Sequence, residues 1–171
     1  MEDSLTIDGY SPWQILGMVT ADLAVLAVIH ALIGGPAPRW PQRWLTRDVG
    51  PLRFLSFETP NFYRKLHVPW LARHLPEAGD TFGGESKSQL PGNDPAALQR
   101  YLVEVRRGEW VHWLSMPTWI VLIFLPWNTW GLIVLWAFIT VGINLMFLSV
   151  LRYNRLRIER ILHITSERNQ A

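Results

Sequence analysis

Long apolar stretches are the feature of this sequence that most restricts its fold. They run over Pro12–Ile33, Trp110–Pro126 and Trp130–Leu151. An α-helix rises about 1.5 Å per residue, so the first and last stretches can each cross the roughly 30 Å hydrocarbon core of a bilayer. The middle stretch is shorter and contains Pro117, which predicts a kink. Because residues 127–129 leave room only for a tight turn, the last two stretches are predicted to form a helical hairpin.

The predicted fold is therefore an all-α integral membrane protein with transmembrane helices at residues 12–33, 110–126 and 130–151. The chain contains 10 tryptophans, and several of them flank the apolar stretches, as expected for a ring that favours the bilayer interface. There are no cysteines, which excludes disulfides and thiolate metal sites. The net charge of +2 argues against a nucleic-acid partner. Acidic rather than basic residues precede the first stretch, so it is interpreted as a retained span and not a signal peptide.

The distribution of Lys and Arg predicts the orientation. Residues 1–11 contain none, residues 34–109 contain eleven and residues 152–171 contain five. By the positive-inside rule, the N-terminal segment lies outside, and the two basic regions are cytoplasmic. The expected location is the bacterial cytoplasmic (inner) membrane, with several crossings. The basic tail, 152–171, either extends the third helix or folds onto the interface.

The region 34–109 is predicted to be irregular and to lie on the cytoplasmic membrane surface. It is rich in Pro, Gly and aromatic residues, and its apolar and basic residues alternate without a clean helical or strand period. Glycines and prolines predict a loop over residues 77–95. Asp94 followed by Pro95 is typical of a helix start, and this helix is expected to continue into the second span.

The stretch 104–113 carries two carboxylates, two arginines and a histidine directly before an apolar run. Glu109 and His112 are three residues apart and therefore share a helix face. A carboxylate that holds one imidazole nitrogen leaves the other to act as a general base. Glu104 and Arg107 have the same spacing, so Arg107 is expected to pair with Glu104 or to bind an anion. The alternative is an interfacial helix with solvated salt bridges.

The predicted hairpin brings the end of the third span back to the same depth. Arg152, Asn154 and Arg155 are then expected near the Glu104–His112 stretch, where arginines flanking an amide suit a phosphate or carboxylate ligand. Asn144 lies inside the span and is interpreted either as a helix–helix contact or as part of the site.

Two polar residues stand within the first span. Asp22 is expected to face protein or water. His30 is a candidate pigment ligand, because His30 followed by Arg39-Trp40 resembles light-harvesting β polypeptides, in which a span histidine binds bacteriochlorophyll. No metal site is predicted.

Several motifs carry a wider resemblance. They are Glu104-x-x-Arg107-x-Glu109-x-x-His112-Trp113, Trp127-Asn128, Asn144-Leu145 and Arg152-Tyr153-Asn154-Arg155, preceded by Phe57-Glu58 and Tyr63-Arg64-Lys65-Leu66. In this order they resemble the glycosyl-4,4'-diaponeurosporenoate acyltransferase family, small membrane acyltransferases of carotenoid-glycoside and staphyloxanthin synthesis. The resemblance covers about residues 54–162.

The resemblance implies transfer of a fatty acyl chain to a sugar hydroxyl of a carotenoid glycoside or similar glycolipid. His112 would be the base, Glu109 would orient it and Glu104 would fix an arginine. Arg107 with Arg152 or Arg155 would hold the phosphate of the donor, an acyl-CoA or acyl carrier protein that serves as co-substrate. No cofactor is required. Asn144 and Asn154 complete the implied substrate-binding residues.

A non-catalytic interpretation stays open. Leu71, Met146 and Leu151 depart from the residues usual in that family, which favours a reused scaffold. The chain would then be an accessory transmembrane subunit of a photosynthetic or respiratory complex, close to carotenoid or bacteriochlorophyll. The expected partners are membrane lipid, a carotenoid or glycolipid substrate, and subunits of such a complex, with no nucleic acid. The resemblance favours the acyltransferase.

Overall fold

The computed structural model describes residues 9–75 and 94–168. Within these ranges the elements are all helical. They are α1 (Pro12–Gly34), η1 (Ala37–Arg39), η2 (Gln42–Trp44), η3 (Gly50–Leu52), α2 (Pro60–Lys65), α3 (Val68–His74), α4 (Pro95–Ser115), η5 (Met116–Phe124) and α5 (Trp130–Arg168). The all-α prediction is confirmed. The predicted loop at 77–95 lies almost wholly outside the described residues, as do residues 1–8 and 169–171.

Side-chain caps explain where α1 and α4 begin. Ser11 and Gln14 form a reciprocal capping box at the start of α1, with Pro12 at the first helical position. The carboxylate of Asp94 accepts from the backbone N–H groups of Ala96 and Ala97, so α4 begins as the sequence predicted.

The helix that begins at Pro95 does not continue regularly through the second apolar stretch. It ends at Ser115, and the nine residues of η5 follow as a 3₁₀-helix. Pro117 is the physical reason, because its ring clashes with the carbonyl four residues earlier and it has no N–H to donate. Pro117 lies in the first turn of η5, where its missing N–H would have no partner within the helix. The predicted kink is therefore a change of helix type.

The last helix is much longer than the predicted span. It has 39 residues and runs without a break from Trp130 to Arg168, a length of roughly 58 Å. The tail therefore extends this helix, which was one of the two sequence-based alternatives. The turn at residues 125–129 joins it to η5, and this confirms the hairpin.

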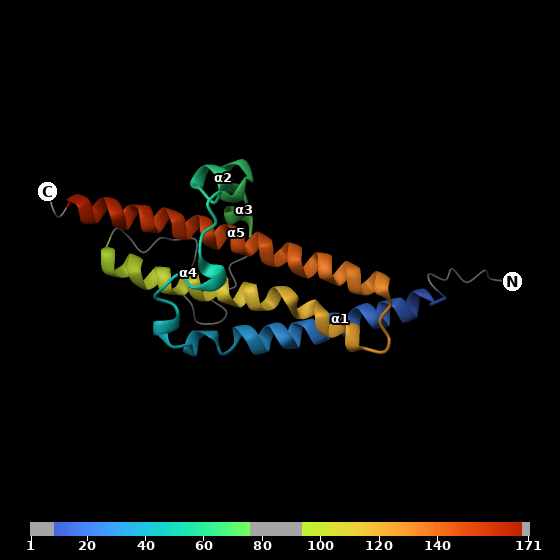
Figure 1. Cartoon of the computed structure of the whole chain (residues 1–171). Coiled ribbons are helices and arrows are strands. Elements are labelled where there is room, and N and C mark those ends of the chain that lie inside the picture. Colours follow the sequence, from blue (N-terminus) through green and yellow to red (C-terminus); the bar gives the residue numbers. More distant parts are fainter. Residues whose placement is uncertain (1–8, 76–93, 169–171) are drawn as a thin grey trace.

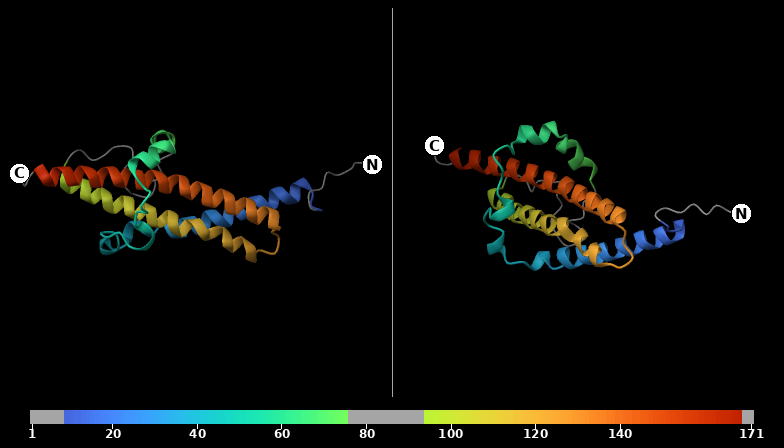
Figure 2. Two further views of the ribbon diagram at one scale, coloured as in Figure 1. Left: turned by 45° about the horizontal axis from the view of Figure 1, so that its top comes forward. Right: turned by 45° about the vertical axis from the view of Figure 1, so that its right-hand side comes forward.

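Three small cores hold the elements together. Leu102 and Val105 of α4 pack against Leu151 and Ile158 along the α4–α5 seam. A second core joins α1, η5 and α5 around the wholly buried Leu122. The third packs α2 and α3 on α5. Figure 1 and the right-hand view of Figure 2 show the result, with α1 on one side of the α4–α5 hairpin and α2–α3 on the other.

Within residues 9–75 and 94–168, two helices, and not the predicted three, are long and apolar enough to cross a membrane. They are the segment Pro12–Arg39 and α5. The middle apolar stretch does not form a helix of that length, because Pro117 divides it between the end of α4 and the 3₁₀-helix. Many apolar side chains of the two long helices face outward, such as Trp13 at 81% exposed and Phe138 at 83%. Such a surface is compatible with a lipid environment.

Asp22 shows how α1 is attached to the hairpin turn. It is fully buried, and its Oδ1 accepts hydrogen bonds from Asn128 Nδ2 at 2.9 Å and from Trp127 Nε1 at 3.2 Å. The expectation that Asp22 faces protein is confirmed. This contact brings α1 to the turn between η5 and α5.

Candidate functional site

A partly buried group of carboxylates and arginines lies where the apolar half of α5 gives way to its charged half. This carboxylate–arginine cluster comprises Asp48, Glu58, Arg106, Glu109, Arg152 and Arg155. Its members come from α4, from α5 and from the irregular segment between α1 and α2. The irregular segment is thereby joined to α4 and α5.

Arg152 has the largest number of partners. Its guanidinium forms a fork with Glu58, with Nε to Oε1 at 2.6 Å and NH2 to Oε2 at 2.5 Å. It also donates to Glu109 and to the carbonyl oxygens of Pro51 and Arg53. Since a guanidinium has five N–H groups, these contacts use its donor capacity inside the protein.

Arg155 is wholly buried and likewise occupied. It donates to Asp48 at 2.5 Å and to the carbonyl of Leu52, and its guanidinium lies 3.9 Å from the centre of the Phe54 ring. Its Nε lies 2.8 Å from Glu109 Oε1, an ion pair in which the N–H is not aligned for a hydrogen bond. Asp48 is shared, because Arg106 Nε also donates to its Oδ1 at 2.7 Å.

The two glutamates of the cluster have opposite pKa shifts. Burial raises the pKa of Glu109 to about 7, although the charges of Arg155 and Arg152 act to lower it. Burial also raises the pKa of Glu58, but hydrogen bonds from Arg152, the backbone N–H of Leu55 and Tyr63 outweigh it, so the net pKa lies below its usual value. Glu58 is therefore a firmly ionised partner for Arg152.

His112 and Asn144 form a separate pair across the α4–α5 seam. Nδ1 of His112 lies 2.9 Å from Oδ1 of Asn144, while Asn144 Nδ2 donates to the carbonyl of Thr140 at 2.8 Å. The second bond fixes the amide so that its oxygen faces the imidazole. Nδ1 then carries the proton, and Nε2 is the basic nitrogen of the neutral ring.

Stacking also fixes the plane of the His112 ring. The ring of Phe147 lies parallel to it, with 5.0 Å between the ring centres and 4° between the planes. The imidazole is half-buried and its orientation is set from two directions, by an amide and by an aromatic face. An imidazole whose plane and tautomer are both fixed suits proton transfer.

The sequence-predicted residues are thus divided between several contacts. Glu109, Arg152 and Arg155 meet, as expected, but they do so inside the carboxylate–arginine cluster. The partner expected for His112 was Glu109, whereas the structure provides Asn144 as the partner of Nδ1. Asn144 therefore joins α4 to α5 through His112, and its role as a site residue stays a prediction.

The remaining predicted site residues lie beside this arrangement. Arg107 NH1 forms the expected ion pair with Glu104. The Nε of Arg107 is buried without a hydrogen-bond partner among the described residues. Asn154 is half-buried on α5, one position before Arg155. His30 donates from Nδ1 to the carbonyl of Leu26 at 2.7 Å when that nitrogen carries the proton, and its use as a pigment ligand stays a prediction.

Sequence reasoning missed two carboxylates of the cluster. Asp48 and Glu58 are the acidic residues between positions 34 and 75, in a region with seven Lys and Arg. Two acidic residues among so many basic ones could have indicated that both form ion pairs. Each pairs with an arginine of α5.

Comparison with known protein families gives a match over most of the chain. The family model described as glycosyl-4,4'-diaponeurosporenoate acyltransferase matches residues 41–164, which is more than two thirds of the chain and includes the cluster, His112 and Asn144. No curated protein and no solved structure matches.

Proposed function

The chain belongs to the glycosyl-4,4'-diaponeurosporenoate acyltransferase family, and from this membership we propose that it moves a fatty acyl chain onto a sugar hydroxyl of a carotenoid glycoside or a similar glycolipid. The acyl donor is a thioester, either acyl-CoA or acyl carrier protein. The interpretation as an accessory subunit of a pigment–protein complex has no observation in its favour among the described residues, and it stays a prediction.

The proposed location is the bacterial inner membrane, with the N-terminus outside and the C-terminus in the cytoplasm. The two long apolar helices support it. So does the arrangement of ends, because the N-terminal end of α1 and the C-terminal end of α5 lie at opposite ends of the molecule (Figure 1). The basic half of α5 and the basic segment after α1 then lie on the cytoplasmic side, as the positive-inside rule requires.

The observation that carries the proposed chemistry is the His112–Asn144 pair. An amide that accepts from Nδ1 fixes the imidazole tautomer in which Nε2 is the base. A histidine oriented by an asparagine serves in the same way in papain-like proteases. Its height along the hairpin matters too, because it lies near the boundary between the apolar and charged halves of α5, where a lipidic acceptor meets a water-soluble donor.

The proposed step is a direct acyl transfer. Nε2 of His112 takes the proton of the sugar hydroxyl while the hydroxyl oxygen attacks the thioester carbonyl carbon. The C–O bond forms, the C–S bond breaks, and the imidazolium returns the proton to the leaving thiolate. Arg107 is the proposed contact for a donor phosphate, and Asn154 for the acceptor. Arg152 and Arg155 are less suited to that role, since internal carboxylates and carbonyls occupy their guanidinium groups.

The test is acyl transfer from palmitoyl-CoA to a glycosylated carotenoid by the full chain in lipid nanodiscs. His112→Ala is expected to lower kcat by about 10²- to 10⁴-fold, the usual contribution of a general base. His163→Ala is the matched control, since His163 lies exposed near the end of α5. Unchanged turnover in H112A, with equal nanodisc incorporation of both variants, would refute the assignment of the base.

A further inference from the structure

A tryptophan-lined cleft lies beside the carboxylate–arginine cluster and has no part in the proposed chemistry. Its volume is about 470 Å³, within the range of small-molecule sites. Trp40 and Trp44 from the segment after α1 line it together with Trp110 and Leu114 from α4, and Arg43, Leu45, Arg47 and Val49 complete the lining. The wall is almost wholly apolar, so the two arginines line it mainly with their aliphatic stems, and the charged residues of the lining are all positive.

These two arginines differ from those of the cluster. Arg43 and Arg47 are exposed, and among the described residues neither guanidinium has a hydrogen-bond or ion-pair partner. The nearest carboxylate in the sequence, Asp48, already accepts from Arg106 and Arg155. The cleft therefore combines an apolar floor with positive charge that the protein does not neutralise.

The cleft also lies at the depth where lipid headgroups would be. Trp110 and Leu114 follow Glu109 of the cluster on α4, and the second apolar stretch begins at Trp110. Tryptophan rings favour the bilayer interface, and arginines next to them bind lipid phosphates. Trp44, 55% exposed, leaves the cleft open to the surface.

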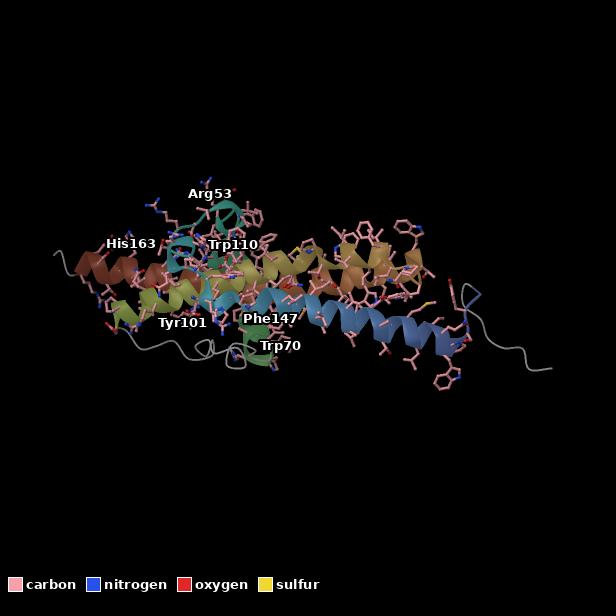
Figure 3. All side chains as sticks on the ribbon, turned by 90° about the horizontal axis from the view of Figure 1, so that it is seen from below. Arg53, Trp70, Tyr101, Trp110, Phe147 and His163 are labelled. Atoms are coloured by element: carbon pink, nitrogen blue, oxygen red, sulfur yellow. The ribbon has the colours of Figure 1, made fainter. Side chains whose placement is uncertain are left out.

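The position of the cleft on α4 separates it from the proposed reaction site. Successive residues of an α-helix are rotated by about 100°, so Trp110 lies about 160° around α4 from His112. Phe147, which stacks on His112, does not line the cleft, and it lies below Trp110 in the view of Figure 3. A chain bound in the cleft would not lie against the imidazole, which argues for a bound lipid rather than the acyl donor.

We propose that this cleft binds one anionic phospholipid, with an acyl chain against Trp40, Trp44 and Trp110 and the phosphate between Arg43 and Arg47. The inference rests on the proposed membrane location but not on acyl transfer. The lipid would join the segment after α1 to α4 from the membrane side, opposite the ion pairs of Asp48.

Lipid binding to the purified full chain tests the proposal. Native mass spectrometry in detergent would count bound dioleoyl-phosphatidylglycerol and dioleoyl-phosphatidylcholine across a titration of each. The wild-type chain is expected to retain one phosphatidylglycerol in preference to phosphatidylcholine. The R43Q/R47Q variant is expected to bind phosphatidylglycerol about 10- to 30-fold more weakly, as two lost phosphate contacts at a membrane surface would predict.

The matched control is R39Q/R73Q, which removes two exposed arginines that do not line the cleft. Trp44→Ala is expected to weaken both lipids without abolishing the preference. Equal affinity in R43Q/R47Q and the wild type, or an equal loss in R39Q/R73Q, would overturn the site. Palmitoyl-CoA is titrated in the same way. If it binds in place of phosphatidylglycerol, the assignment of a phospholipid is refuted and the cleft is a site for the acyl donor. Because the readout is binding, an inactive chain leaves this test intact.

Discussion

Arg155 offers the sharpest test of how the irregular segment is held against the long helices. Its side chain is wholly buried and contacts Glu109, Asp48, the Leu52 carbonyl and the Phe54 ring. Arg155→Met keeps similar length and apolar packing but removes the charge. Glu109 is then left fully buried with Arg152, at 3.3 Å, as its ion-pair partner among the described residues.

The expected loss is large because the remaining charge cannot reach water. Breaking a buried ion pair by removing one partner costs about 3–5 kcal/mol, and most of that is the uncompensated charge. If this is the cause, neutralising Glu109 in the same chain should return part of the loss. The double variant R155M/E109Q is therefore expected to recover about 1–3 kcal/mol relative to R155M, the range of couplings between residues in contact.

The assay is reversible unfolding in mixed micelles with increasing dodecyl sulfate, followed by far-ultraviolet circular dichroism. Arg160→Met is the matched control, since Arg160 is exposed five residues further along the helix and should change the free energy of unfolding by about 0.5 kcal/mol or less. A loss in R155M no larger than in R160M would refute the reasoning. So would a double variant whose loss equals the sum of the two single losses.

Three further changes follow from the contacts described above. Asn144→Leu should lower kcat by about 10²-fold or more with little change in KM, because the imidazole of His112 loses its tautomer; the carotenoid assay measures this. Asp22→Leu removes the oxygen that accepts from Trp127 and Asn128 and should cost about 1–3 kcal/mol in the unfolding assay, whereas Asp22→Asn keeps an acceptor and should lose less. The folded-state pKa of Glu58 lies below its ordinary value of 4.5, so its stabilisation is present above about that pH and is lost as pH falls through the folded-state pKa. The unfolding midpoint of the wild type should then fall more steeply below pH 4.5 than that of E58Q.

The sequence predicted the elements whose signals are local. Asp94-Pro95 marks the start of α4 by a cap that involves only its own first turn. The apolar stretches predict the long helices, and the short turn after Pro126 predicts the hairpin. The prediction of a second transmembrane helix was wrong because of Pro117. At this residue the chain changes from an α-helix to a 3₁₀-helix, and the sequence alone does not show which helix type follows a proline.

The partners of the site residues could not be predicted in the same way. Spacing along α4 shows that Glu109 and His112 share a face, but each side chain can also meet residues from other segments. Burial decides the outcome for Glu109, because a carboxylate without water needs a strong cationic partner and Arg155 lies within reach. His112 lies one turn further toward the apolar end, where the polar group opposite it is Asn144.

The arginines of this chain therefore fall into two functional classes that their number alone would not separate. Arg152 and Arg155 of α5 form ion pairs with Glu58 and Asp48, and these ion pairs fix the irregular segment to α5. That anchoring has a consequence for ligands. Asp48 is flanked by Arg47 and Val49 of the tryptophan-lined cleft, so the ion pairs that fix Asp48 also hold Arg47 at the cleft with its charge unneutralised. The internal salt bridges thus make an external anion site possible, which is why R155M should weaken phosphatidylglycerol binding although Arg155 itself touches no lipid.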